Sequence, residues 1–321
     1  MRNAAVSTLP YGGEKPRFRA SWAALDCEHE RANSTPYRAS KSTCVQIERR
    51  EVMAEKFAVI TGASSGIGYE LARVFGENGY DLLINSSGER LERAASDLKS
   101  LGFEVIMVQS DLSTYEGVEQ LWREIEQTGR PVDAIAMNAG IGVGGDFTRE
   151  TDLNEELKMI QLNVTSVVHL AKRVLKQMVA RGEGKVLITS SVAGAMPAPL
   201  EAVYGATKAF DLSFAKALRN ELKDTGITVT ALQPGPTNTD FFHRAGLDNT
   251  EVGSEGKYTN DPREVARQGY EALMANKDQI YASSLKTKVQ GELGRFVPDS
   301  FKAEQHRKKA EPKEQKEKKS A

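Results

Sequence analysis

The feature that most constrains how this chain can fold is a regular alternation of short apolar runs with segments of helical spacing. A short run that is apolar throughout is typical of a strand covered on both faces, whereas apolar residues three and four apart are typical of a helix. Seven runs predict strands, at 57–60, 81–84, 105–108, 132–137, 185–189, 227–232 and 279–282. Helical spacing lies between them, most clearly at 69–75, 90–101, 118–125, 204–222 and 262–274.

This alternation predicts the class of fold. Parallel strands need crossover connections, which helices usually supply, so strands and helices in turn indicate one parallel sheet. We predict an α/β fold, a doubly wound, seven-stranded parallel sheet flanked by helices on both faces, forming a single domain over residues 53–300. Ligands of such sheets bind beyond the carboxyl ends of the strands, so we expect the chemistry in the residues that follow each strand.

The two ends of the chain lack the alternation. Residues 1–52 show neither period and are interrupted by turn-forming residues, so we predict a disordered extension and expect the native start at Met53. They contain no apolar core of a signal peptide and are too acidic for a transit peptide. Residues 301–321 mix Lys and Glu with few apolar side chains, which predicts a charged, disordered tail. The basic cluster at 307–309 is either hydrated or a contact for an acidic partner.

Charge and cysteine content exclude several classes of protein. The chain has 43 basic and 44 acidic side chains, so no overall positive field favours nucleic acid. No stretch reaches the ~20 apolar residues that a membrane span needs. Both cysteines, Cys27 and Cys44, precede the predicted domain, and the whole chain has four histidines, so we expect no metal site. These features favour a cytoplasmic protein without nucleic-acid or membrane partners.

A glycine-rich turn joins the first predicted strand to the first predicted helix. The segment Thr61-Gly62-Ala63-Ser64-Ser65-Gly66-Ile67-Gly68 has the strand–turn–helix context that a phosphate-binding loop requires. Gly62 permits a tight turn, Gly66 lets the backbone approach a diphosphate, and Gly68 lets the helix pack closely. No Gly-Lys-Ser/Thr follows, which favours a dinucleotide over a nucleotidase loop; a plain tight turn is the alternative. A second glycine cluster at 140–145 indicates a flexible loop beside the site.

Tyr204 and Lys208 form a candidate general acid/base pair. Residues four apart share one face of a helix, and Ser191, at the end of the fifth predicted strand, lies thirteen residues before Tyr204. The same Tyr–Lys interval occurs twice within residues 1–52, but neither of those pairs follows a predicted strand. An ammonium beside a phenol favours the ionised phenol, which would bring the pKa of Tyr204 towards the working pH.

Taken together, these motifs resemble the short-chain dehydrogenase/reductase family in its compact, single-domain form. The resemblance spans about residues 55–285 and rests on the glycine-rich turn at 61–68, Asn138-Ala139-Gly140, Ser191, the Tyr204/Lys208 pair and Pro234-Gly235. It implies a Rossmann-like fold and an NAD(P)-dependent oxidoreductase that transfers hydride between nicotinamide and a carbonyl or alcohol substrate. Met137 departs from the pattern, because many members have a second Asn there.

The resemblance also implies roles for individual residues. Tyr204 would exchange the proton of the substrate oxygen, Ser191 would orient that oxygen, Lys208 would bind the nicotinamide ribose and tune Tyr204, and Asn163 would support a water relay. Asn163 is alternatively a solvated helix residue. The residues predicted to bind cofactor, besides Tyr204 and Lys208, follow the strands: Gly62, Ser64, Ser65, Gly66, Ile67, Gly68, Ser86, Arg90, Asp111, Leu112, Asn138, Ala139, Gly140, Pro234, Gly235, Thr237 and Thr239.

The segment after the second predicted strand favours NADP over NAD. An acid there would accept the ribose 2′-hydroxyl, whereas a basic residue would hold a 2′-phosphate. The segment Asn85-Ser86-Ser87-Gly88-Glu89-Arg90 has no acid directly at the strand end but offers hydroxyls and the guanidinium of Arg90. Alternatively, Arg90 is an exposed helix residue and Ser87 a helix cap.

Substrate and assembly are less constrained. The polar segment 241–261 is typical of a mobile lid, and Ala193, Met196, Phe241 and Phe242 would give the site an apolar wall suited to a carbonyl or alcohol of moderate size. The family commonly pairs its two long helices, here around 162–178 and 204–222, so we expect a homodimer or homotetramer. A non-catalytic NADP-binding sensor or scaffold on the same fold is the alternative function, but it would not need Tyr204, Lys208 and Ser191 together.

Overall fold

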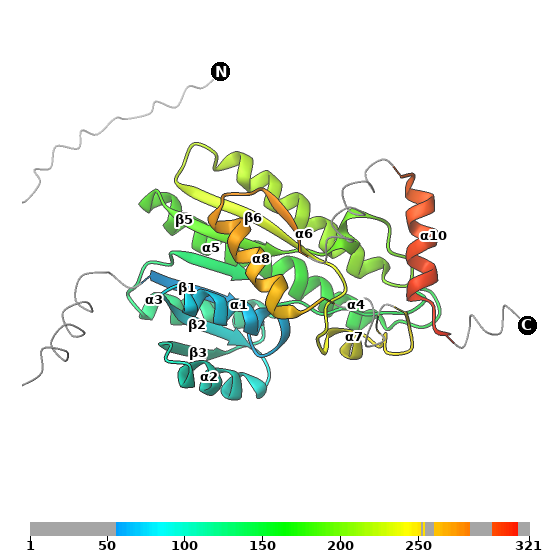
Figure 1. The fold of residues 1–321 in the computed structure, drawn as a ribbon, viewed down its shortest axis with the longest axis horizontal. Helices are drawn as coiled ribbons and strands as arrows, with labels where there is room; N and C mark the ends of the chain where they lie inside the picture. The colour runs from blue at the N-terminus through cyan, green and yellow to red at the C-terminus, as the bar shows by residue number, and fades with distance from the viewer. Residues whose placement is uncertain (1–55, 252, 254–259, 283–296, 314–321) are drawn as a thin grey trace, which may run out of the picture. The chain divides into compact units, whose positions relative to one another are not determined.

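A computed structural model describes residues 56–251, 253, 260–282 and 297–313 (Figure 1). Within these ranges the chain alternates strand and helix as far as β7 and then adds one helix. The strands are β1 (Lys56–Thr61), β2 (Tyr80–Ser86), β3 (Val105–Gln109), β4 (Ala134–Met137), β5 (Gly184–Thr189), β6 (Ile227–Pro234) and β7 (Gln279–Ala282). The helices are α1 (Gly66–Glu77), α2 (Arg90–Ser100), α3 (Tyr115–Gln127), α4 (Leu153–Ile160), η1 (Gln161–Thr165), α5 (Ser166–Arg181), η2 (Val192–Ala195), α6 (Ala202–Glu221), α7 (Phe241–Arg244), α8 (Pro262–Met274) and α10 (Asp299–Ala310).

The seven strands form one parallel sheet in the order β3-β2-β1-β4-β5-β6-β7. The predicted fold class is therefore confirmed. The strand order reverses beside β1, which has β2 on one side and β4 on the other. Connections leave in opposite directions at such a point, and this opens a crevice at the carboxyl ends of the strands.

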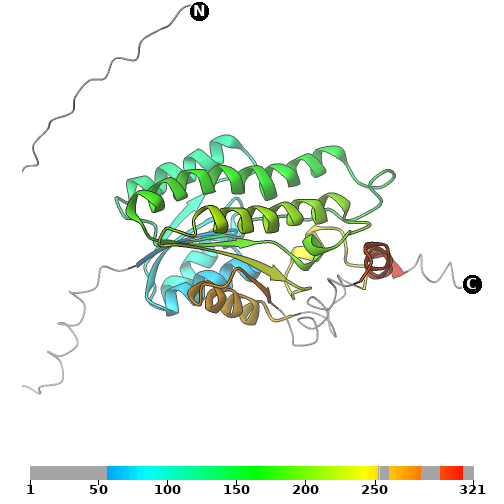
Figure 2. The ribbon, with the colours of Figure 1, turned by 90° about the horizontal axis from the view of Figure 1, so that it is seen from above.

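Helices cover the sheet on both faces, as Figure 2 shows with α5 and α6 on one side and α1 and α8 on the other. Successive residues of β1 enter opposite layers: Phe57 and Val59 pack with α3 and α5, whereas Ala58 and Ile60 pack with α1, α2 and α8. Both sets of side chains are buried, which is why the strands are apolar throughout instead of alternating with polar residues.

The fourth strand is shorter than predicted. Asp133 lies in the predicted run at 132–137, but its carboxylate accepts a hydrogen bond from the backbone amide of Phe57 at 2.8 Å. The pairing of β4 with β1 consequently begins one residue later, with Ala134 opposite Ala58.

Residues 299–313 do not form the unstructured tail that the scarcity of apolar residues predicts. They include α10, whose last residue, Ala310, is buried. The helix is tied to earlier parts of the domain: the amide of Glu251 donates to the carbonyl oxygen of Lys309 at 3.1 Å, and His306 Nε2 lies 3.0 Å from Glu201 Oε2. These contacts with distant residues hold α10 in place, although the helix has no apolar face. Residues 314–321, like 1–52 and the expected start at Met53, lie outside the described ranges.

The helices within the described ranges include none that is long and apolar enough to span a bilayer.

The end of β2 contains a buried amide that the sequence does not reveal. Asn85, which opens the segment expected to select the cofactor, turns its side chain towards β3, where Nδ2 donates to the carbonyl oxygen of Val108 at 3.0 Å and to Ser110 Oγ at 2.9 Å. The side chain is buried and therefore supports the sheet instead of facing a ligand. Ser86, the next residue, is half-buried and points the other way along the pleat.

We expect Asn85→Asp to destabilise the fold, because a buried carboxylate would face the acceptor oxygen of Val108 in place of a donor. The expected loss is at least about 2 kcal/mol in the free energy of unfolding, measured by urea denaturation. Ser86→Asp is the matched control and should stay within about 0.5 kcal/mol of wild type. Equal effects of the two substitutions would contradict the assignment of Asn85 to the sheet.

Candidate active site

The glycine-rich turn connects β1 to α1 at the point where the strand order reverses. Gly62 and Gly66 adopt positive φ values of 68° and 58°. A Cβ on Gly68 would lie 2.1 Å from the carbonyl oxygen of Gly62, so only glycine allows α1 to begin this close to the strand. The first turn of α1 contains no acidic residue, and its N-cap Ser65 makes no side-chain hydrogen bond to it. The helix N-terminus therefore suits an anion such as a diphosphate.

The segment after β4 is held against this turn. Thr61 Oγ1 accepts hydrogen bonds from the amides of Asn138 at 3.0 Å and Ala139 at 3.1 Å, and a Cβ on Gly62 would lie 2.8 Å from Ala139 Cα. The Asn138 side chain continues the network, because its Oδ1 accepts a hydrogen bond from Thr189 Oγ1 at 3.2 Å. Strand ends that are far apart in sequence are thereby fixed at one edge of the sheet.

Ser86 and Arg90 lie near the turn, on the side of β2. Ser86 Oγ donates to Ser64 Oγ at 3.1 Å, which connects the end of β2 to the glycine-rich turn. Arg90 is ion-paired with Asp240, just before α7, and its guanidinium lowers the pKa of that carboxyl. Both members of the pair are more than half exposed, so a ligand phosphate can compete for Arg90.

The segment after β6 approaches the turn from the other side. A Cβ on Gly66 would lie 2.9 Å from Thr239 Cγ2, so Thr239 packs directly over the turn. Thr237 is buried and donates to the carbonyl oxygen of Gly235 at 2.8 Å, which fixes the bend after Pro234.

Two of the residues predicted to bind the cofactor, Asp111 and Leu112, lie after β3. Asp111 Oδ1 accepts a hydrogen bond from the amide of Ser113 at 2.9 Å, and Leu112 is buried. The carboxylate of Asp111 is thus used in the local turn.

Tyr204 lies on the first turn of α6 and is only 8% exposed. Burial raises the pKa of its phenol, the Glu201 carboxylate raises it further, a hydrogen bond from Ser191 lowers it, and Asp211 raises it. This direction is the reverse of the one expected from Lys208 alone, because loss of hydration disfavours the phenolate more than the hydrogen bond favours it.

Lys208 is buried one turn further along α6. Its Nζ donates to the carbonyl oxygen of Thr189 at 2.9 Å and to Asp211 Oδ2 at 3.0 Å. A Cβ on Gly140 would lie 3.4 Å from this Nζ, so the ammonium is next to the segment that follows β4. The only signal of Asp211 in the sequence is its spacing of three residues from Lys208, which places both on one helix face.

Asn163 lies in η1, a π-helical turn between α4 and α5, and is fully buried, so it is not the solvated helix residue considered above. Its Oδ1 accepts a hydrogen bond from the amide of Ile141 at 3.0 Å, and its Nδ2 donates to the carbonyl oxygen of Ile141 at 2.9 Å and to Thr207 Oγ1 at 3.1 Å. Isolated π-turns occur frequently at functional sites. The turn brings Asn163 between the loop after β4 and the helix that contains Tyr204.

An apolar cluster surrounds the Tyr204 ring. Ala193 and Phe241 belong to it as expected, with ring centroids of Tyr204 and Phe241 5.3 Å apart, and Phe242 packs on Phe241. Met196 is not part of the cluster. Ile141 and Val143 come from the glycine cluster at 140–145, which the sequence predicts to lie beside the site. Three further members come from segments in which the sequence gives no signal for a site: Met159, Ala198 and Val203.

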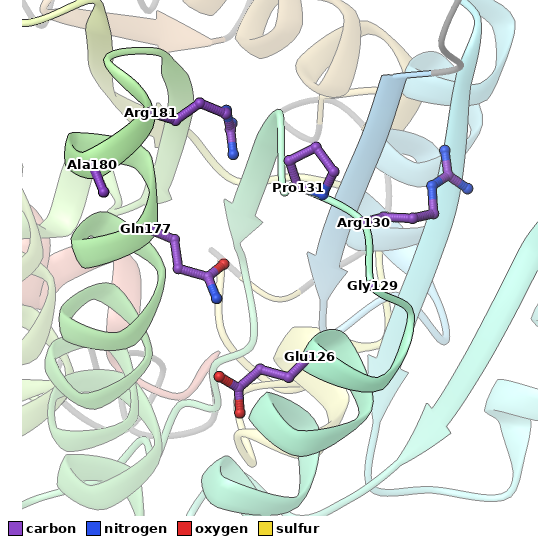
Figure 3. Close-up of a pocket in the computed structure, with 7 residues that line it drawn as sticks. All are labelled: Glu126, Gly129, Arg130, Pro131, Gln177, Ala180 and Arg181. Atoms are coloured by element: carbon purple, nitrogen blue, oxygen red, sulfur yellow. The ribbon is translucent and has the colours of Figure 1, made fainter. Parts of the chain in front are cut away.

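A separate cavity of about 580 Å³ opens at the amino end of the sheet, between the end of α3 and the end of α5 (Figure 3). Its arginines already have partners, because Arg130 bonds to Asp81 at 2.7 Å and Arg181 donates to the carbonyl oxygen of Val132 at 2.7 Å. The cavity is separate from the glycine-rich turn and Tyr204, because these lie at the carboxyl ends of the strands.

A family model described as short chain dehydrogenase matches residues 56–250. The chain belongs to the short-chain dehydrogenase/reductase family. As a member of this family it is an NAD(P)-dependent oxidoreductase, which confirms the resemblance.

Curated members with similar sequences include oxidoreductases from several bacteria. Oxidoreductase UcpA of Salmonella typhimurium is 29% identical over 259 residues, which covers 76% of this chain and 96% of that protein. The NADP-dependent 3-hydroxy acid dehydrogenase YdfG of Salmonella typhi is 32% identical over 177 residues, covering 55% of this chain and 71% of its own length.

Solved structures of other dehydrogenases share the fold. A short-chain dehydrogenase from Sphingobium yanoikuyae in complex with NADPH is 27% identical, with a TM-score of 0.66 over 76% of this chain and 96% of that one. An alcohol dehydrogenase from the archaeon Thermococcus sibiricus complexed with 5-hydroxy-NADP is 28% identical, with a TM-score of 0.62 over 72% and 97%.

Proposed function

We propose that this short-chain dehydrogenase interconverts a carbonyl and an alcohol using NADP(H), with Tyr204 as the general acid/base. The observation that carries the proposal is the burial of the Tyr204 phenol, whose pKa the side chain of Ser191 lowers, with the buried Lys208 one helical turn further along α6. A buried phenol of this kind needs a proton-transfer role or a structural partner, and here its neighbours are the hydroxyl and ammonium that proton exchange requires.

The glycine-rich turn supports the cofactor. The uncapped N-terminus of α1 and the glycines at 62, 66 and 68 form a cradle in which added Cβ atoms would collide with neighbouring backbone or with Thr239. The residues present thus fit a dinucleotide diphosphate, and NADP(H), when bound, supplies or accepts the hydride.

The side chains around Tyr204 handle the substrate oxygen. In the reductive direction the phenol donates its proton to the carbonyl oxygen as negative charge develops there. Ser191 Oγ already accepts a hydrogen bond from the amide of Ala193 at 3.1 Å, which orients the hydroxyl so that its proton can be donated to the same oxygen. Asn163 and Lys208, both beside Gly140, provide the polar path along which the phenol regains a proton.

The raised pKa of Tyr204 favours reduction over oxidation near neutral pH. Reduction requires the protonated phenol, so its rate is retained below the pKa of Tyr204 and falls as the pH rises through that value. We infer that a carbonyl compound of moderate size, accommodated by the apolar cluster around Phe241, is the substrate.

We expect Tyr204→Phe to lower kcat for carbonyl reduction by about 10²–10⁴-fold with nearly unchanged NADPH affinity, because the ring packing remains and the exchangeable proton is lost. The measurement is steady-state NADPH oxidation over a panel of ketones and aldehydes, with NADPH affinity from fluorescence titration. Tyr115→Phe, an exposed tyrosine on α3, is the control and should leave both quantities unchanged. NADPH binding by the wild-type protein without turnover of any carbonyl would indicate a non-catalytic sensor instead.

We further propose NADP as the preferred cofactor. Ser86 and Ser64 are hydrogen-bonded at the end of β2, and Arg90 follows at the start of α2, so hydroxyls and a guanidinium gather where the adenosine ribose is expected. No acidic residue stands directly at this strand end. The YdfG relative is NADP-dependent, and the Sphingobium and Thermococcus structures contain NADPH and a modified NADP, which supports the same choice. Binding of the 2′-phosphate would replace the Asp240 carboxylate at Arg90.

We expect Ser86→Asp to shift preference towards NADH, because the new carboxylate repels a 2′-phosphate and accepts a hydrogen bond from a 2′-hydroxyl. Arg90→Ala should weaken NADPH more than NADH, and a differential of about 1–3 kcal/mol corresponds to roughly 5–150-fold. Both affinities can be measured by calorimetry. Arg93→Ala, on the same helix and 89% exposed, is the control. A wild-type protein that binds NADH more tightly than NADPH would overturn the proposal.

We also propose that the protein acts in the cytoplasm as a homodimer or homotetramer. Val168 and Val179 on α5 and Phe210 on α6 are exposed apolar side chains on the two long helices. Packing these side chains against a second copy of the chain would remove their apolar surface from water and so stabilise the assembly.

We expect light scattering at micromolar concentration to show a dimer or tetramer, and Phe210→Lys combined with Val179→Lys to shift it to monomer, since charges in an apolar interface are poorly solvated. Leu101→Lys is the control, because Leu101 is a similarly exposed apolar residue at the end of α2, away from the two long helices, and its substitution should leave the oligomer unchanged. A monomeric wild-type protein would refute the assembly.

A further inference from the structure

The face of α6 that carries Tyr204 and Lys208 also carries a buried carboxylate, that of Asp211. The three residues are spaced four and three apart, so they lie along one side of the helix. Asp211 is 0% exposed and Lys208 5% exposed, and Asp211 Oδ2 lies 3.0 Å from Lys208 Nζ.

We infer that Asp211 is a positioning residue of the active site, which fixes the ammonium of Lys208 and balances its charge beside Tyr204. This inference rests on the function proposed above and adds a fifth side chain to the four that the sequence predicts.

Burying the Asp211 carboxylate at this position costs free energy. Its second oxygen, Oδ1, is buried and has no hydrogen-bond partner among the residues that the structure describes. Burial raises the pKa of Asp211, and Lys208 is the charged group that lowers it. An apolar residue of similar size in place of a buried ion pair is often neutral or stabilising, so stability alone gives no reason for Asp at this position.

The geometry shows what the carboxylate contributes to Lys208. An ammonium has three N–H donors, and here two acceptors are fixed, the carbonyl oxygen of Thr189 at the end of β5 and the carboxylate of Asp211. Two bonds from different elements hold Nζ next to Gly140 and leave one donor for a ligand or for the proton path. A long, flexible side chain is thereby ordered before any ligand arrives.

The charge of Asp211 acts on Tyr204 as well. The charged groups that act on the phenol are Glu201 and Asp211, and Glu201 in turn contacts His306 of α10. Glu201 and Asp211 both raise the pKa of the phenol. Burial is the main cause that keeps Tyr204 protonated, and Asp211 adds to it in the same direction, which favours the role of the phenol as a proton donor.

The test is Asp211→Asn, which keeps the shape of the side chain and removes its charge. With the negative charge gone, the pKa of Tyr204 should fall by about one pH unit. Alcohol oxidation with NADP⁺ requires the phenolate. In the variant, kcat/KM for oxidation should therefore begin to rise at a pH about one unit lower than in the wild type. At pH values below the pKa of Tyr204, kcat/KM for oxidation should be up to about tenfold higher in the variant than in the wild type. A purely structural role would lower the plateau without moving the profile.

Three further variants make the result specific. Asp211→Ser removes the same charge and should move the profile in the same direction, so poor folding of one variant does not decide the outcome. Asp211→Glu retains the charge and should restore the wild-type position of the profile. Glu221→Gln, which removes an exposed carboxylate at the end of α6, should leave the profile unmoved. Profiles of Asp211→Asn and Asp211→Ser that superimpose on wild type, or that move to higher pH, would overturn the inference.

A readout without turnover separates this inference from the proposed function. The near-ultraviolet absorbance of tyrosinate, taken as the difference between the protein with Tyr204 and the same protein carrying Tyr204→Phe, reports ionisation of this one phenol. Asp211→Asn should move that titration to lower pH whether or not a substrate has been found. If the titration moves and no alcohol or ketone is turned over, the proposed function fails while the role of Asp211 stands. If turnover depends on Tyr204 and the titration does not move, only the role of Asp211 fails.

Discussion

The parallel pairing of β1 with both β2 and β4 is the constraint on which the site depends. Because the strand order reverses there, the connections after β1 and β4 diverge, and the N-terminus of α1 lies at the carboxyl end of β1. Thr61 accepts hydrogen bonds from the segment after β4, and Asn138 carries the network on to β5. The positions of Ser191, Tyr204 and Lys208 follow from this arrangement, since β5 lies beside β4 in the sheet and leads to Ser191 and then to α6.

Local patterns in the sequence predict the parts of the molecule whose causes are local. Apolar runs predict the strands because both faces of the sheet are covered, and glycines predict the turn because only they fit its close contacts. Tyr204 and Lys208 fall on one face of α6 because they are four residues apart in a helix.

Other features depend on contacts between distant residues, and the sequence predicts them poorly. Asn85 faces β3 instead of a ligand, Arg90 is paired with a carboxylate 150 residues away, and α10 is held by contacts near residues 201 and 251. Even the direction of the Tyr204 pKa shift depends on burial, which one helix face cannot reveal.

The π-turn at Gln161–Thr165 has a mechanical consequence for the helix that contains it. One extra residue in a helical turn rotates everything that follows by about 100° relative to what precedes it. Met159, before the turn, packs beside Tyr204, whereas Val167 and Leu170, after it, pack on the sheet. The continuous helix formed by α4, η1 and α5 therefore packs against two surfaces of different orientation, the Tyr204 cluster and the sheet. Deleting one residue from the turn would restore a uniform helix and carry one of its two apolar stripes into solvent.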